Sequence, residues 1–303
     1  MLKLPTGRAI CYSGYREGQS PDQHHYPSLD QIHEDLLMLQ GHWPLLRLYD
    51  CSTHALRVLQ LIRAEGLRFQ VMLGAYLGAE ASNPGCPWGG LYSPEQLAAN
   101  TAENEAEVGR LIALANEYSD IVFSVAVGNE ATVDWTDHLV PVPRMTLHVR
   151  RVKRSVAQPV TFCESYVPWL RTLHELAAEL DFISLHTYPV WEHKPVHEAL
   201  AHSQANYAQV RRCHPGKPIV ITEAGWATHS NGRGIPPPHT SQAWQAIYLR
   251  DLLGWTDAEG ILCFVFEAFD EPWKGSPDPL EPEKHWGLYT VDRQPKRVLQ
   301  EGL

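Results

Sequence analysis

Two apolar segments of this sequence each end in a glutamate, and these two carboxyl groups are its strongest candidates for chemistry. Residues 218–226 read PIVITEAGW and contain Glu223, and residues 121–130 read IVFSVAVGNE and end in Glu130. An ionisable group at the end of a buried strand is either a structural ion-pair partner or a catalytic group. Two carboxyl groups on two strands are what glycosidic bond cleavage requires, one as proton donor and one as nucleophile or base.

Strand-like apolar segments alternate along the whole chain with segments of helical periodicity. The eight predicted strands are residues 8–15, 45–51, 68–76, 121–130, 159–166, 182–189, 218–226 and 260–269. The predicted helices between them are residues 29–39, 55–64, 94–118, 143–156, 196–212 and 241–253. Because no charged linker interrupts the alternation, it predicts an α/β fold of parallel units, a (β/α)8 TIM barrel. Residues 1–303 would then form a single catalytic domain. A doubly wound open sheet is the alternative, but CYSGYREG near the first strand is not the GxGxxG of that fold.

Active sites of such barrels lie at the C-terminal ends of the strands, and these ends are polar and aromatic here. We predict substrate-binding roles for the following strand-end residues: Tyr15, Asp50, Asn129, Glu164, His186, Tyr188, Trp226 and Glu271. Two Gly/Pro-rich segments, residues 78–92 and 228–239, follow the third and seventh predicted strands. Loops at these positions would wall a cleft.

The motifs at these strand ends resemble those of glycoside hydrolase family 17, the β-1,3-glucanase family, in its bacterial and fungal branch. They are GNE, TEAGW and FEAFDEPWK at the ends of predicted strands 4, 7 and 8, HWGLY shortly afterwards, and CYSGYREGQSPD near the start. The resemblance covers residues 8–291. It implies a (β/α)8 fold and a retaining mechanism acting on β-1,3-glucan, with Glu130 as the general acid/base and Glu223 as the nucleophile.

Several residues beside the two acids allow more than one role. Asn129 is a candidate partner for the sugar 2-hydroxyl, or a turn-forming residue. Tyr188 could orient the nucleophile by a hydrogen bond, or cap a backbone group. Glu271 and Lys274 match a Glu and a Lys that the resembled family keeps near its catalytic pair. They predict a charge network that orients Glu223 or binds a hydroxyl, or else a structural salt bridge.

Ten tryptophans are a high number for this length, and tryptophan faces stack well on sugar rings. Seven of them fall on predicted loops or strand ends of the cleft side: Trp88, Trp135, Trp169, Trp191, Trp226, Trp273 and Trp286. Each alone is more often a packing residue, since tryptophan is usually largely buried. We expect Trp135, Trp273 and residues 78–92 to lie on the acceptor side of the cleft. Near the second predicted strand, we expect Arg47 and Asp50 to form a structural ion pair.

Composition bears on partners and cofactors. The net charge of -10 and pI near 5.9 disfavour nucleic acid and anionic membrane surfaces and suit a neutral substrate. Sixteen histidines occur without HExxH or zinc-finger spacing, so no metal or other cofactor is expected. Six cysteines without a CxxC pair, and no apolar signal segment at the start, predict reduced thiols in the cytoplasm. An excised domain of an exported protein would share these features.

Three functional hypotheses follow. The first is a retaining glycosidase that cleaves β-1,3-glucosidic linkages of laminarin-type glucan or its oligosaccharides, with endo or exo action. The second is a β-1,3-glucan transglycosylase, in which a sugar hydroxyl replaces water as the acceptor. The third is a non-catalytic glucan-binding protein, which predicts the loss of a catalytic acid, whereas both acids are present.

Overall fold

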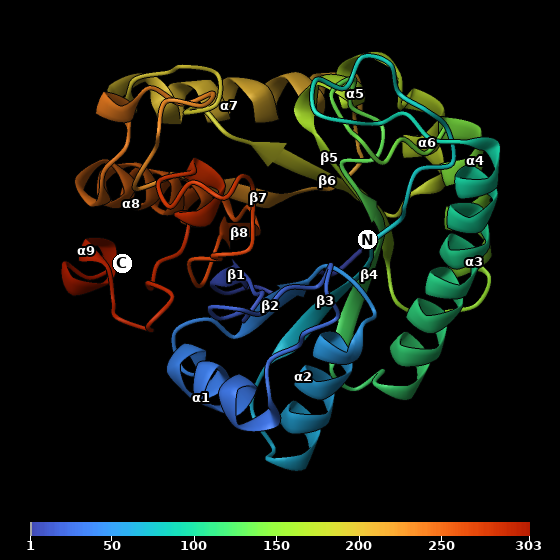
Figure 1. Ribbon diagram of the computed structural model, residues 1–303, viewed down its shortest axis with the longest axis horizontal. Helices are drawn as coiled ribbons and strands as arrows, with labels where there is room; N and C mark the ends of the chain where they lie inside the picture. Colours follow the sequence, from blue (N-terminus) through green and yellow to red (C-terminus); the bar gives the residue numbers. More distant parts are fainter. Residues whose placement is uncertain (1) are drawn as a thin grey trace.

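The computed structural model describes residues 2–303, and within this range eight parallel strands close into a barrel (Figure 1). The strands are β1 (Ala9–Cys11), β2 (Leu45–Leu48), β3 (Gln70–Ala75), β4 (Val122–Asn129), β5 (Val160–Ser165), β6 (Ile183–Thr187), β7 (Ile219–Gly225) and β8 (Cys263–Phe266). Each strand pairs with the next one in sequence, and β8 pairs with β1. The predicted (β/α)8 TIM barrel is therefore confirmed.

Helices form an outer layer around the strands (Figure 1). They are α1 (Leu29–Leu39), α2 (Thr53–Ala64), α3 (Pro94–Glu117), α4 (Val142–Lys153), α5 (Tyr166–Arg171), α6 (His174–Glu179), α7 (Val196–Cys213), α8 (Gln242–Glu259) and α9 (Arg297–Gln300). Serine side chains cap several N-termini, and Ser28 and Ser93 complete capping boxes with Gln31 and Gln96. Helices α5, α6 and α9 were not among the predicted helices, because segments of four to six residues are too short for a periodic signal.

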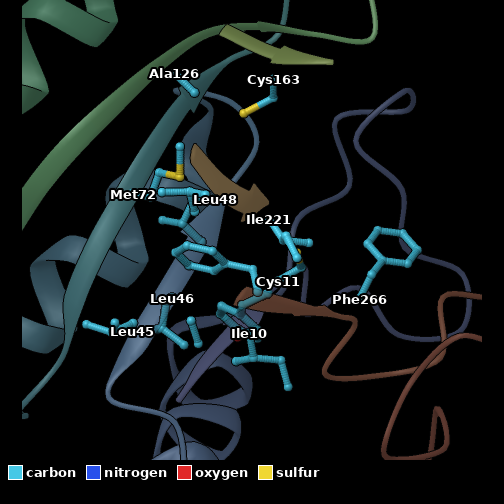
Figure 2. Packing of buried hydrophobic residues seen from close by; sticks show 14 of the residues in the cluster. Ile10, Cys11, Leu45, Leu46, Leu48, Met72, Ala126, Cys163, Ile221 and Phe266 are labelled. Carbon is cyan, nitrogen blue, oxygen red and sulfur yellow. The ribbon is translucent and has the colours of Figure 1, made fainter. Parts of the chain in front are cut away.

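Apolar side chains fill the barrel and the space between strands and helices. Figure 2 shows part of this core, in which side chains from different strands pack together, including Ile10, Leu48, Met72, Cys163 and Ile221. Such an interior is closed to substrate, so a binding site must lie on the loops at the rim.

All six cysteines, which belong to the described part of the chain, are unpaired, and Cys213 alone among them is exposed. Buried thiols of this kind behave as small apolar groups. Across residues 2–303, no helix is both long enough and apolar enough to cross a membrane.

Candidate active site

Glu130 and Glu223 meet at the C-terminal rim of the barrel. Glu223 lies in β7, and Glu130 directly follows β4. One carboxylate oxygen of each residue and one ring nitrogen of His186 lie within 4.8 Å of one another. The two carboxyl groups of retaining glycosidases stand about 5 Å apart, whereas inverting enzymes separate them by about 6.5–9.5 Å. The arrangement therefore fits the retaining geometry.

Glu223 is buried and held by side chains from the ends of β2 and β6. Arg47 Nη1 donates to Oε1 at 2.5 Å, and Tyr49 donates to the same oxygen at 3.1 Å. Tyr188 donates to Oε2 at 2.6 Å, which confirms the predicted hydrogen bond to this glutamate. Burial by itself would raise the pKa of Glu223, but the charges of His186 and Arg47 outweigh it and lower the pKa to about 2. Glu223 is thus a carboxylate at neutral pH, as a nucleophile must be.

The predicted ion pair between Arg47 and Asp50 is wrong. Arg47 is buried within β2 and pairs with Glu223, and its Nη2 donates to Asn129 Oδ1 at 2.5 Å. Asp50 lies beyond the end of β2, where it accepts a hydrogen bond from the Ser52 backbone at 3.0 Å. Because strand side chains alternate between faces, Arg47 points into the barrel. Its partners are 82 and 176 residues away in sequence, so no local pattern indicated them.

Glu130 lies in a different setting, on a turn with an unusual backbone. Its φ is +46°, and that of Gly128 is +88°, both in the left-handed region. Glycine is required at position 128 because a φ of +88° is unfavourable for any residue with a side chain. The Glu130 amide donates to the Cys163 carbonyl at 2.9 Å, and its side chain is 18% exposed. The turn therefore directs a partly solvated carboxyl group into the rim.

His186 bridges the two acids. Its Nδ1 lies 2.9 Å from Glu130 Oε1 and 3.4 Å from Glu223 Oε2. Burial would lower the pKa of His186, but the charge of Glu223 and the hydrogen bond to Glu130 raise it to about 10. Within residues 2–303, these three side chains form the cluster with metal-ligand spacing. Because Nδ1 faces a carboxylate oxygen of each acid, His186 can share a proton with either of them.

The predicted charge network after β8 exists, but it does not include Glu223. Lys274 pairs with Glu267 at 2.9 Å and also with Glu271, and its ammonium lies 4.5 Å from the centre of the Phe266 ring. Trp273 donates to Glu271 at 3.1 Å. Burial would lower the pKa of Lys274, but Glu267 and Glu271 raise it, so the residue stays charged. Both residues border the cleft, but only Lys274, with a side chain that is 18% exposed, can meet a sugar hydroxyl group, because Glu271 is fully buried.

Glu283 lines the same part of the rim, is half-buried, and was not among the predicted site residues. Burial raises the pKa of Glu283 to about 7, against the lowering effect of Lys274 and with smaller raising effects of Glu130, Glu281 and Glu223. Its carboxyl group can therefore donate or accept near neutral pH. Glu283 belongs to a short 3-10 helix, η2 (Pro282–Lys284), rather than to a strand end. The nearby HWGLY motif was the signal that could have indicated it.

A cleft of about 2080 Å³ crosses the rim and includes the two acids. Most of the residues predicted to bind substrate line it: Tyr15, Asp50, Asn129, His186, Tyr188, Glu271, Trp273, Lys274, Trp135 and Trp286. Both predicted wall loops contribute, through Pro87 and Trp88 and through Arg233 and Gly234.

Three of the predicted stacking tryptophans are fully buried: Trp169, Trp226 and, at the edge of the cleft, Trp286. Trp226 is fully buried, packs beside Tyr248 of α8, and donates to the His239 carbonyl at 2.9 Å. Trp169 is fully buried against Phe162. Neither Trp226 nor Trp169 lines the cleft: Trp226 faces α8, and the Trp169 indole donates to the Ser184 carbonyl at 3.0 Å.

Glu164 was also predicted to bind substrate, and it is fully buried below the rim instead. Its carboxyl group accepts hydrogen bonds from the Thr132 backbone at 2.9 Å, the Thr132 hydroxyl at 2.7 Å and the Ser165 backbone at 2.7 Å. Burial, followed by the charge of Glu130, raises the pKa of Glu164 to about 7. Through its hydrogen bonds to Thr132, Glu164 therefore stabilises the segment that follows Glu130.

The aromatic side chains that are exposed in the cleft are not the buried tryptophans. Trp286 borders the cleft but has no exposed surface, because Tyr188 and Trp191 pack on it. Tyr76, Trp88 and Trp135 are 46%, 55% and 38% exposed, and the two indole rings lie 6.1 Å apart. These three residues follow β3 and β4 and form the exposed aromatic group of the cleft.

Comparison with known proteins places this geometry in context. Residues 9–287 match the model of the BtgE/BtgC glycoside hydrolase domain. A glucan 1,3-beta-glucosidase of Arthroderma benhamiae is 23% identical, over 92% of this chain and 85% of that protein. An endo-laminarinase of Formosa Hel1_33_131 is 27% identical with a TM-score of 0.79, over 97% of this chain and 86% of that one.

A further solved structure shares the fold. An active-site mutant of a beta-1,3-glucanosyltransferase from Rhizomucor miehei, in complex with laminaritriose, superposes with a TM-score of 0.75 at 22% identity. The alignment covers 96% of each chain. At this identity the likeness concerns the barrel alone.

Proposed function

The chain belongs to the BtgE/BtgC glycoside hydrolase domain family and is a glycosidase, and we propose that it cleaves β-1,3-linked glucan by a retaining mechanism. One observation carries the mechanism: Glu130 and Glu223 bring carboxylate oxygens within 4.8 Å in contrasting environments. The substrate class is supported by the glucan 1,3-beta-glucosidase and the endo-laminarinase to which the chain is similar.

In the first step, Glu223 attacks the anomeric carbon while Glu130 gives its proton to the leaving glycosidic oxygen. The carbon–oxygen bond to the leaving sugar breaks as the glycosyl ester forms. Arg47 and Tyr188 hold the attacking carboxylate in one orientation before the reaction. In the second step, Glu130 takes a proton from water, whose oxygen attacks the same carbon and releases Glu223.

Asn129 is well placed to bind the sugar 2-hydroxyl. Because Arg47 donates to Asn129 Oδ1, the amide oxygen is the acceptor of this pair, and the Nδ2 hydrogens remain free to donate. A hydrogen bond to the 2-hydroxyl strengthens as the transition state forms. Arg47 thus orients both the nucleophile and this amide.

A second candidate function is transglycosylation. The exposed group of Tyr76, Trp88 and Trp135 offers stacking faces to an incoming sugar that competes with water. Trp273, which was expected on the same side, packs against Tyr15 at a ring distance of 6.0 Å. It therefore lies beside the loops after β1 and β8, and we assign it to the opposite side of the cleft.

The two candidates are separated by incubating the protein with laminari-oligosaccharides of defined length and following products by mass spectrometry. We expect shorter products from the wild type and none from Glu223→Gln. Longer products would identify transfer as a major activity. Inactivity on β-1,3 chains combined with cleavage of another linkage would overturn the proposed substrate but not the two-carboxylate mechanism.

A further inference from the structure

His138 lies directly behind the turn that carries Glu130. Its Nε2 is 2.9 Å from the Asn129 carbonyl, and its Nδ1 is 2.8 Å from Asp137 Oδ1. A carbonyl and an ionised carboxylate can only accept, so a ring that bonds to both of them donates from both nitrogens; the hydroxyls of Thr136 and Tyr76, each 3.1 Å from Nδ1, lie beside the same proton. The side chain is 16% exposed. The geometry therefore indicates a largely buried imidazolium cation next to the catalytic rim.

The bond to Asn129 acts on a backbone segment that needs support. The Asn129 carbonyl lies between two residues of left-handed conformation, Gly128 and Glu130. Left-handed φ is unfavourable for a residue with a side chain and persists where the surroundings enforce it. Because this carbonyl belongs to the peptide plane that precedes Glu130, any rotation of the plane redirects the Glu130 carboxyl group.

The charged and titratable groups around His138 come from three segments. Asp137 belongs to the same loop, Glu130 follows β4, and Tyr76 follows β3 with its hydroxyl 3.1 Å from Nδ1. Burial would lower the pKa of His138, but the hydrogen bonds to Asp137 and Asn129 and the charges of Asp137 and Glu130 raise it. The imidazole ring also lies 4.9 Å from the ring of Tyr76, which is exposed in the cleft.

We propose that His138 is a positioning residue for Glu130: as an imidazolium it holds the Asn129 carbonyl and thereby aims the acid/base carboxyl group. It also links this turn to the exposed ring of Tyr76, so that a sugar stacked there contacts the same rigid unit. The proposal rests on the proposed function of Glu130.

The test compares His138→Ala with the wild type on two substrates. Laminaripentaose needs a proton from Glu130 to release its leaving group, whereas 2,4-dinitrophenyl β-laminaribioside does not. We expect kcat/KM to fall about 10- to 100-fold on laminaripentaose, part of what a general acid contributes, and less than about threefold on the dinitrophenyl substrate. Sodium azide, which replaces base-activated water, should raise kcat of the variant on the dinitrophenyl substrate but not that of the wild type.

His138→Gln and His214→Gln complete the design. The glutamine at 138 can still donate to the Asn129 carbonyl, so it should restore part of the laminaripentaose activity. His214 also bonds a backbone carbonyl, that of Trp169 at 2.7 Å, but it does not line the cleft. Its glutamine variant should leave the ratio of the two kcat/KM values unchanged.

Equal losses on both substrates without an azide effect would overturn the proposal, because they indicate a merely structural histidine. Nitrogen NMR of the wild type provides a test that does not depend on folding of the variants: both ring nitrogens of His138 should carry protons at pH 7, and a neutral ring would overturn the proposal. A wild type inactive on both substrates would refute the proposed function, while the NMR result would still decide the state of His138.

Discussion

The two carboxyl groups at the rim occupy opposite kinds of environment. Glu223 is 4% exposed, lies within β7, and accepts hydrogen bonds from Arg47, Tyr49 and Tyr188. Glu130 follows the end of β4 on a left-handed turn, with a side chain that is 18% exposed and contacts His186.

This difference matches what each role demands. A nucleophile must remain ionised and in place, and the charges around Glu223 lower its pKa to about 2. An acid/base must lose and regain a proton in every cycle, so it needs contact with solvent or substrate. Two carboxyl groups in such different surroundings can take different roles in one site, one as the acid and the other as the nucleophile.

Replacing each acid in turn should give the largest effects and tests this assignment directly. Glu223→Gln should lower kcat about 10⁴-fold or more on every substrate, because no covalent intermediate can form. Glu130→Gln should be comparably slow on laminaripentaose but retain rapid ester formation with 2,4-dinitrophenyl β-laminaribioside, seen as a burst in stopped-flow absorbance. A burst from the Glu223 variant instead would reverse the two roles.

Removing Arg47 should make the environment of Glu223 less different from that of Glu130. In Arg47→Gln, the pKa of Glu223 rises because a cation that favours the carboxylate is lost, so the acid limb of the kcat/KM profile should move to higher pH. Breaking a buried ion pair should also lower the free energy of unfolding by about 3–5 kcal/mol. Arg63→Gln, which removes an exposed pair with Asp120, is the control and should change neither quantity appreciably. An unshifted acid limb would mean that Arg47 does not tune Glu223.

Tyr188→Phe should have a smaller effect, since it removes one hydrogen bond to Glu223 and keeps the ring packed on Trp286. We expect kcat to fall about tenfold, the equivalent of roughly 1.4 kcal/mol. Tyr248→Phe is a matched control, because its buried hydroxyl bonds Ser203 away from the cleft. Similar losses in both variants, measured by steady-state kinetics, would refute a specific role for Tyr188.

The smallest expected effect is on the free energy of unfolding. The contribution of Glu283 to it should change with pH in the opposite direction to that of Glu223. Glu283 has a pKa of about 7 in the fold against 4.5 ordinarily, so the folded state binds more protons between these values. The stability that it contributes is present below pH 4.5 and is lost as pH rises through about 7. Glu223, whose pKa is lowered, contributes stability above pH 4.5 that is lost as pH falls through about 2.

Glu283→Gln should therefore gain about 1–3 kcal/mol relative to the wild type between pH 4.5 and pH 8. Urea unfolding at several pH values measures this difference. A constant difference across that range would show that Glu283 titrates normally.

Most of the fold could be predicted because its signals are local. The predicted strand 218–226 contains β7 (Ile219–Gly225), and the predicted helix 29–39 matches α1 in both of its ends. Apolar runs and helical periodicity are properties of short segments of the sequence. The alternation of these segments along the chain implies a parallel barrel. Helices α5 and α6 were not predicted, because six residues are too few to show helical periodicity.

The sequence by itself determined which strand ends carry carboxyl groups, and it placed Glu130 and Glu223 at one rim. The tertiary structure decided what surrounds them: that Arg47 pairs with Glu223 rather than Asp50, and that Trp226 faces the helices. The physical reason is distance along the chain. Side-chain orientation at a strand end, and contacts between residues such as Arg47 and Glu223 that lie 176 positions apart, depend on barrel closure and register.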